Sequence, residues 1–312
     1  MRTLFILVSL VLLTCVGLAC TEPQLTPTPT STSVPELTKA PGPLPTPTTT
    51  STMTTATVTP APTATNTPTI TPTVGPVEIN YEISEGVPSE DLEVIQTGIG
   101  YARSYIHDHL GGDITSDFQE GSITVKFVTG GTRGNCCVAS SEGIIFDVDH
   151  IVWAEPERWL VPGNRVTTKI ARMKMAAHEY AHLWQHSLGC LRAPPSWIVE
   201  GMAEYIGWQT LVNAGVIDDD TVTGFNRYGA INDPRDVSVT LESMETFIPG
   251  AYNLPYFAIR QLVIQAEDGP AALRTFCEVS GSGQWRGTFH SAFGIDVDEF
   301  YEQFEGQRRR GL

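Results

Sequence analysis

The sequence is short of basic residues. It contains 19 Lys and Arg against 35 Asp and Glu, which gives a formal net charge of −16 at pH 7. A protein that binds nucleic acid neutralises phosphates with a basic surface, and its Lys and Arg gather on one face or along one helix. The acidic balance therefore argues against nucleic acid as a partner.

A long apolar run is also missing. The stretch from Leu4 to Leu13 is mostly apolar, but it is shorter than the roughly 20 residues that span a bilayer. Arg2 precedes it and small residues follow it, a pattern typical of an export signal. We therefore predict that residues 1–19 direct export, with a membrane-spanning anchor as the alternative.

This segment ends in Gly17-Leu18-Ala19-Cys20, which resembles a bacterial lipoprotein box, although Gly17 stands where that pattern usually has Leu. The resemblance implies that Cys20 is lipidated and that the lipid tethers the protein to the outer face of the bacterial cell membrane. Cys15 is a weaker candidate for the same modification. Plain secretion is the alternative to a lipid anchor.

The segment at 20–75 lacks aromatic residues and nearly all charge, and it consists mainly of Pro, Thr, Ser and Ala. Such a segment has too little apolar surface to offset the entropy lost on ordering. Its composition predicts a disordered, semi-rigid stalk of the kind that carries O-linked glycans. The chain is thus divided into an export signal at 1–19, a stalk at 20–75 and a folded domain at 76–312.

The cysteines lack the CxxC spacing of a metal site, so we do not expect a cysteine-ligated metal. Beyond the signal the chain has Cys136, Cys137, Cys190 and Cys277. Outside the cytoplasm an even number of cysteines indicates disulfides. Adjacent Cys136 and Cys137 are not expected to pair with each other, so we predict bridges from them to Cys190 and Cys277.

The folded part reads as α+β, with a small sheet and one helix in its N-terminal half and a mostly helical C-terminal half. A long helix at about 166–188 lies between the two halves. The expected strands are Val77–Ile83, Ile123–Val128 and Gly143–Val148. The expected helices begin after Pro88 with Ser89 as N-cap, and lie at about 166–188, 196–213 and 255–266, with short helices near Leu273, Phe289 and Phe300.

The long central helix carries the motif H-E-x-x-H, from His178 to His182. Residues four apart on a helix point the same way, so His178 and His182 can hold one Zn²⁺ at about 2.0–2.1 Å. Glu179 is offset around the helix and can reach a metal-bound water without being a ligand. The alternative is an ordinary amphipathic helix with two surface histidines.

Catalytic zinc usually takes three protein ligands and a water molecule. The next predicted helix carries Trp197-Ile-Val-Glu200-Gly-Met-Ala-Glu204-Tyr205, and the Pro194-Pro195 turn before it would bring Glu200 back beside the histidines. The two motifs together resemble the gluzincin group of zinc metallopeptidases, the MA-like families. The resemblance covers about residues 123–304.

The resemblance implies a zincin-like fold for residues 76–312, one Zn²⁺ per chain and Glu200 as the third ligand. It further implies Glu179 as general base and Glu204 as a carboxylate that orients a ligating histidine. Tyr252 is the implied hydrogen-bond donor to the oxyanion, with Tyr256 as the second choice. For Glu204 the alternative is a solvated helix residue, and for the tyrosines it is packing in the core.

Neighbouring families fit less well. A metzincin would have Gly at position 185 and His at 188, where this chain has Gln185 and Leu188. The Gly-Ala-Met-Glu-Asn signature of the related aminopeptidases is absent, so amino-terminal trimming is not favoured. His186 reads as a neighbour of the site or a surface residue. The acidic run at Asp218–Asp220 reads as a solvated turn, since no EF-hand loop accompanies it.

The sequence therefore predicts a zinc metallopeptidase, an endopeptidase that acts on extracellular proteins or peptides. The alternative is a non-catalytic cell-surface binding module that retains a peptidase-like fold. A module of that kind has no need of Glu179, so the complete motif favours catalysis. A cell-wall hydrolase is a weaker alternative. Cleavage specificity is expected to involve the strand Gly143–Val148 as a sheet edge, and oligomeric state is left open.

Overall fold

The structure is a computed structural model that describes residues 77–114, 121–130, 135–156, 165–191, 194–246, 250–280 and 284–312. All of these belong to one compact unit, Pro68–Leu312. The predicted export signal, Cys20 and the stalk lie outside the described residues. No helix among the described residues is both long and apolar enough to cross a membrane.

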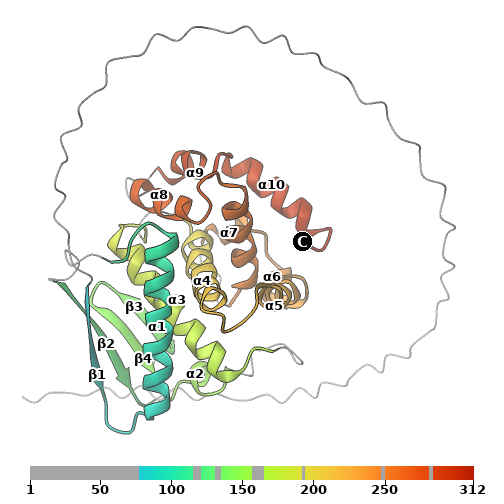
Figure 1. Ribbon diagram of the computed structural model, residues 1–312. Helices are drawn as coiled ribbons and strands as arrows, with labels where there is room; N and C mark the ends of the chain where they lie inside the picture. The colour runs from blue at the N-terminus through green and yellow to red at the C-terminus, as the bar shows by residue number, and fades with distance from the viewer. Residues whose placement is uncertain are drawn as a thin grey trace, which may run out of the picture. The chain divides into compact units, whose positions relative to one another are not determined.

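The N-terminal half is a four-stranded sheet covered by a helix (Figure 1). Its strands run in the order β1-β2-β4-β3, where β1–β2 and β2–β4 are parallel and β3–β4 is antiparallel. Parallel neighbours need a crossover connection, and α1 supplies it between β1 and β2. The bounds of these elements are β1 Glu78–Ile83, α1 Ser89–His109, β2 Ser122–Val128, β3 Cys137–Ser140 and β4 Gly143–Asp147.

The C-terminal half is helical, as the sequence predicts, and the mixed α/β character of the domain is confirmed. Its central helix, α4, contacts α1, α3 and α7, which explains why it is apolar on nearly every side. The bounds are α2 Ile151–Ala154, α3 Thr168–Ser187, α4 Ser196–Asn213, α5 Asp219–Asn232, α6 Pro234–Val237, the 3₁₀ helix η3 Glu242–Glu245, α7 Asn253–Gln265, α8 Ala271–Ser280, α9 Trp285–Phe293 and α10 Val297–Arg308.

Glycines allow the helices around α3 to approach closely. A Cβ added to Gly98 of α1 would lie 2.4 Å from the carbonyl oxygen of Met173, and one added to Gly207 of α4 would lie 3.1 Å from that of Lys174. Any larger residue would therefore push α1 or α4 away from α3. The helix with the HExxH motif is thus held between two close neighbours.

Local signals explain where α3 and α4 begin and end. The hydroxyl of Thr167 accepts a hydrogen bond from the backbone N–H of Ile170 and caps the first turn of α3. Gly189, with φ +76°, follows the end of the helix in the left-handed conformation that glycine favours. Pro195 stands before the first residue of α4, so the chain reverses within a few residues and α4 packs along α3.

Three expectations about the elements are wrong. The strand β4 was expected as a sheet edge, but it lies between β2 and β3, and β3 is the edge strand. With only four residues, β3 is too short for the alternation of apolar and polar residues that would have predicted it. The expected turn at Asp218–Asp220 is the start of α5, where Asp218 is the N-cap and its side chain accepts a hydrogen bond from the backbone N–H of Thr221. Ser89 is the first helical residue of α1, and Pro88 occupies the N-cap position.

The predicted disulfide pairing is also wrong, since Cys190 bonds to Cys277 and Cys136 bonds to Cys137. Cys190 follows α3 and Cys277 lies on α8; both are fully buried, with their Cα atoms 4.6 Å apart. Because these two satisfy each other, the adjacent cysteines at the start of β3 are left to pair, with their Cα atoms 3.8 Å apart.

Candidate metal centre

The two histidines of the HExxH motif lie one turn apart on α3 and face each other. Their Nε2 atoms are 3.0 Å apart and their rings are nearly perpendicular, at 84°. His178 is only 8% exposed. The interpretation of these residues as two surface histidines is therefore wrong, because His178 is buried between α3 and its neighbours.

Glu200 reaches the same point from α4. Its Oε2 lies 3.4 Å from the Nε2 atom of each histidine. A tetrahedral Zn²⁺ with ligand bonds of about 2.0–2.1 Å separates its ligand atoms by about 3.3 Å. The three side chains thus fit a metal ion of this size. Among the described residues, they form a group whose possible ligand atoms all lie within 4.8 Å of one another.

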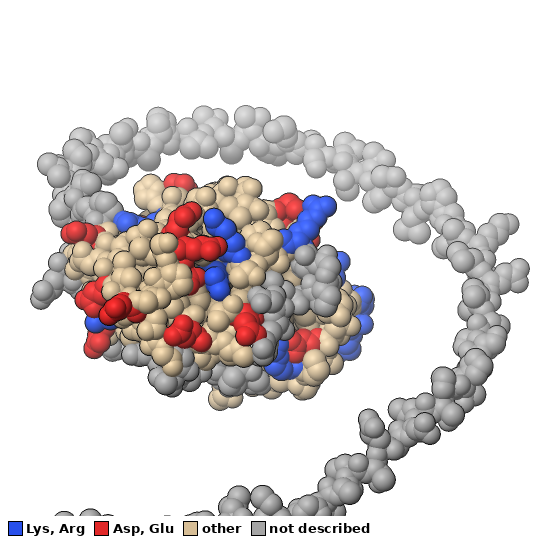
Figure 2. Space-filling view, turned by 90° about the horizontal axis from the view of Figure 1, so that it is seen from below, with Lys and Arg blue, Asp and Glu red and all other residues tan. Residues whose placement is uncertain are grey.

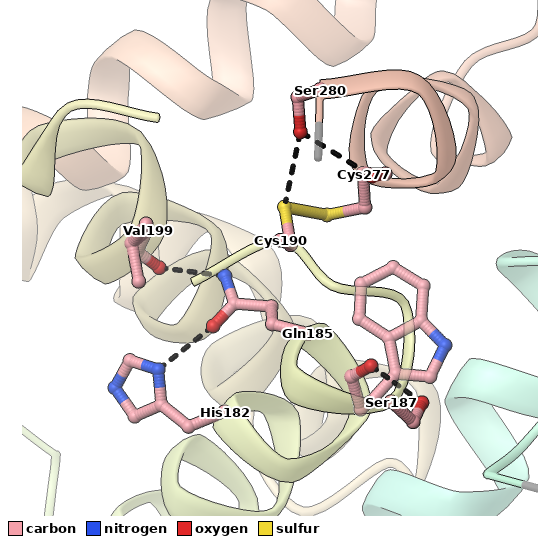
Figure 3. Close-up of a disulfide and its surroundings, with 8 residues drawn as sticks. His182, Gln185, Ser187, Cys190, Val199, Cys277 and Ser280 are labelled. Carbon is pink, nitrogen blue, oxygen red and sulfur yellow. Dashed lines mark hydrogen bonds between the residues drawn. A yellow bond between two sulfur atoms is a disulfide. The ribbon is translucent and has the colours of Figure 1, made fainter. Parts of the chain in front are cut away.

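The amide of Gln185 orients His182 and also ties α3 to α4 (Figure 3). Its Nε2 donates to the carbonyl oxygen of Val199, at 2.8 Å. Its Oε1 must then face Nδ1 of His182, 2.8 Å away, so that Nδ1 donates. This leaves the lone pair on Nε2 for a metal ion. Gln185 is fully buried, and the sequence reading did not identify it as a site residue.

Glu204 orients the other histidine, in the role that the resemblance implies. Its Oε2 accepts a hydrogen bond from Nδ1 of His178, at 3.1 Å, and also forms an ion pair with Lys174. Its Oε1 accepts a hydrogen bond from Nε1 of Trp208, at 3.2 Å. Glu204 is 4% exposed, so the alternative of a solvated helix residue is wrong.

Lys174, Gln185 and Trp208 are the site residues that the sequence reading missed. Lys174 precedes His178 by four residues, Gln185 follows His182 by three, and Trp208 follows Glu204 by four. Residues at these spacings share a helix face. The signal was therefore present, but it became specific only once α4 was known to pack against α3.

The charges around the ligands favour a cation at their centre. Burial lowers the pKa of His178, but hydrogen bonds with Glu200 and Glu204 outweigh it and raise this pKa to about 9. Burial raises the pKa of Glu200, yet its hydrogen bonds with His178 and His182 bring it far below the ordinary value. The carboxylates of Glu200 and Glu204 thus stabilise positive charge at His178 and His182, and such an environment also favours a metal ion.

Glu179 is next to the first histidine and lines the same cavity. No described residue forms a hydrogen bond or an ion pair with its carboxylate, in contrast to the carboxylates of Glu200 and Glu204. The Glu179 side chain is therefore available to a water molecule or a substrate. A carboxylate in this position can act as a general base.

Tyr252 closes the other side of the site, at the N-cap of α7. Its ring centroid is 6.1 Å from that of His178, and it lines the cavity. Burial raises the pKa of Tyr252, and the negative charges of Glu200 and Glu204 raise it further, so the hydroxyl stays protonated and can donate a hydrogen bond. Tyr256, the second choice, is fully buried against Tyr205 and is a core residue.

The ligands lie in a cavity of about 1000 Å³. Residues of β3, α2, α3, α4 and α5 line it, together with the segments around α6 and the start of α7. Seen from below, the described surface carries acidic side chains among uncharged ones, with basic side chains in small separate groups (Figure 2). His186, half-buried on α3, is not among the residues that line the cavity.

We find no match between the chain and known protein-family models or curated proteins. The functional argument therefore rests on the chemistry of the cavity itself.

Proposed function

We propose that the protein is a zinc metallopeptidase with a zincin-like fold that hydrolyses peptide bonds in extracellular proteins or peptides. The observation that carries this proposal is the convergence of His178, His182 and Glu200 on one point, with the carboxylate of Glu179 beside it and held by no described residue. Three ligands leave the fourth position of a tetrahedral ion open, which distinguishes a catalytic from a structural zinc site.

Zinc held by His178, His182 and Glu200 would supply a Lewis acid and would lower the pKa of a water molecule at the site toward about 7. Glu179 takes a proton from the attacking water and passes it to the leaving amine. Tyr252, protonated at neutral pH, donates a hydrogen bond to the oxygen that becomes negative during the attack. Glu204 and Gln185 hold the two imidazoles in the tautomer that presents Nε2.

The test combines metal content with proteolysis of unfolded casein. Purified wild-type protein should contain one zinc per chain and cleave casein. Glu179→Gln should keep its zinc and lose at least about 10³-fold in kcat, because the general base contributes up to about 10⁴-fold and also positions the water. Glu200→Ala should lose or weakly bind zinc. Exposed Glu267→Gln is the matched control and should behave as wild type.

Two outcomes separate this proposal from its alternative. Stoichiometric zinc without cleavage of any unfolded protein or peptide would support a non-catalytic surface module. Absence of zinc from the wild-type protein would contradict the proposed metallopeptidase function, and the buried histidines would then be structural.

The proposed setting of the enzyme is the outer face of the bacterial membrane, or the medium around the cell. It is supported by the apolar run before Cys20 and by the stalk composition at 20–75. Metabolic labelling with a radioactive fatty acid tests the anchor: label should enter the wild-type protein and not Cys20→Ser. Unlabelled, released wild-type protein would indicate plain secretion.

A further inference from the structure

Aromatic side chains form one wall of the cavity. Phe225 and Tyr228 lie one turn apart on α5, and both line the cavity together with Trp208 of α4. The ring of Phe225 lies on the buried ring of Trp208, with centroids 5.5 Å apart. Tyr228 is 51% exposed, so much of its ring is accessible to a ligand in the cavity. We call Trp208, Phe225 and Tyr228 the aromatic wall.

The aromatic wall is connected directly to the metal centre. Trp208 donates to Glu204, and Glu204 accepts from His178, so two hydrogen bonds separate the wall from a ligand. The first half of α3 contributes Met175, one turn before His178, to the same cavity. Because these residues and the candidate ligands line one cavity, a substrate whose scissile bond lies at the metal centre can place a neighbouring side chain against them.

Among the described residues that line this part of the cavity, none offers a substrate an unpaired charge outside the candidate metal centre. Among the described lining residues, Lys174 is paired with Glu204 and lies 5.6 Å from the ring of Trp208, while Arg235 is paired with Asp233. The remaining carboxylates, Glu179 and Glu200, belong to the metal centre. A charged substrate side chain would lose its hydration here without gaining a partner, whereas an apolar one gains by leaving water.

We infer that the part of the cavity lined by the aromatic wall and Met175 binds a large uncharged side chain, aromatic or branched aliphatic, of a residue next to the scissile bond. Phe225 and Tyr228 are the residues that set this specificity. The inference rests on the proposed peptidase function and adds to it a substrate class. Trp208 is excluded from this role, because it also holds Glu204.

Cleavage sites in unfolded casein are mapped first by mass spectrometry. Peptides are then made that differ only at the residues flanking the best site, with Phe, Leu, Ala, Asp or Lys. We expect kcat/KM to be about tenfold to a hundredfold higher for Phe or Leu than for Ala on one side of the bond, and lowest for Asp and Lys. The wild-type preference should shrink in Phe225→Ala and in Tyr228→Ala, because kcat/KM should fall more for the Phe and Leu peptides than for the Ala peptide.

Ile231→Ala is the matched control, because Ile231 is 41% exposed on the same helix but does not line the cavity. It should keep the wild-type preference. Since Phe225 packs on Trp208, Phe225→Ala could also loosen α5; exposed Tyr228→Ala and a thermal melt of each variant separate specificity from stability. Casein cleavage without apolar preference, or a preference unchanged in both variants, would overturn the inference.

A binding measurement separates this failure from failure of the proposed function. Zinc-loaded Glu179→Gln is titrated with the Leu and Ala peptides by calorimetry. We expect tighter binding of the Leu peptide by about tenfold, and loss of that difference when Tyr228→Ala is added. Equal affinities would overturn the pocket assignment even if the enzyme is active. A wild-type protein that neither binds zinc nor cleaves casein would contradict the proposed peptidase function.

Discussion

At the scale of single residues, the proposed metal centre depends on hydrogen bonds made by the residues behind the candidate ligands. Both imidazoles are held through Nδ1, one by the carboxylate of Glu204 and the other by the amide of Gln185. These partners decide the orientation and basicity of the ligands. Their removal should therefore change metal affinity although neither touches the metal.

The first prediction concerns Gln185. Gln185→Ala should weaken zinc binding by about 10- to 100-fold, because His182 loses its fixed tautomer and the carbonyl of Val199 loses its donor. Competition with a chromogenic chelator measures the affinity. The control is Gln209→Ala on α4, whose amide bonds to Asp219 instead of a ligand. An affinity equal to that of wild type would show that Gln185 only joins the two helices.

The second prediction concerns the buried ion pair of Lys174 and Glu204. Lys174→Met leaves the buried carboxylate of Glu204 with His178 as its remaining cationic partner and should lower the free energy of unfolding by about 3 kcal/mol. The double variant Lys174→Met, Glu204→Gln should recover part of that loss, since no buried charge then lacks a partner. Denaturant titration at pH 7 in the presence of a chelator measures all three proteins. A double variant less stable than Lys174→Met would contradict this account.

The same pair predicts a pH dependence. Burial raises the pKa of Glu204, but the charge of Lys174 and the hydrogen bond with His178 outweigh it and lower this pKa to about 2. A carboxyl whose pKa is lowered by folding adds stability above its unfolded value and loses that contribution as the pH falls toward the folded one. Wild-type stability should therefore drop between about pH 4.5 and pH 2 more steeply than that of the double variant.

At the scale of elements, the position of the HExxH helix depends on how closely α1 and α4 pack against it. Gly98 of α1 touches the backbone of Met173, and Gly207 of α4 touches that of Lys174. The two histidines can meet Glu200 only if α4 stays at this distance from α3. Small residues at helix crossings are thus part of the metal centre's support.

The third prediction uses two glycines of α1. Gly98→Ala should lower the free energy of unfolding by about 1–3 kcal/mol, because its Cβ would lie 2.9 Å from that of Ala176 and closer still to the Met173 carbonyl. Gly100→Ala, with nothing within 4 Å of the new Cβ, should instead stabilise by about 0.5–1 kcal/mol through higher helix propensity. Denaturant titration compares the two, and equal effects would contradict the predicted close contact.

At the scale of the whole molecule, the disulfide Cys190–Cys277 joins the end of α3 to α8 across 87 residues of chain. Closing so long a loop restricts the unfolded chain strongly. The bridge lies near Gln185 (Figure 3). The backbone carbonyl of Gln185 accepts a hydrogen bond from the N–H of Cys190. It therefore anchors α8 to the end of α3, the helix that carries the candidate ligands His178 and His182.

The fourth prediction compares the two disulfides. Replacing Cys190 and Cys277 by Ala should lower the free energy of unfolding by about 4 kcal/mol, given the loop of 87 residues. Replacing adjacent Cys136 and Cys137 by Ser removes almost no loop entropy and should change stability much less. Thermal and denaturant unfolding under oxidising conditions measure both. A larger effect at Cys136 and Cys137 would show that their pair holds β3 in place.

The sequence by itself was enough to predict the parts of the site that depend on local geometry. The spacing of His178 and His182 determines that both face one side of a helix, and Glu200 could be assigned because a short Pro-Pro turn returns the chain along that helix. The small sheet and the helical second half followed from the same kind of short-range pattern. These features depend on residues close together in the chain.

Only the tertiary structure decided which distant elements surround the metal centre. It placed β3 at the sheet edge, paired Cys190 with Cys277, and brought Phe225 of α5 onto the wall of the cavity. It also showed that Lys174 pairs with Glu204 from the neighbouring helix. Such contacts depend on helix packing and on which buried groups remain to satisfy each other, and no short stretch of sequence contains that information.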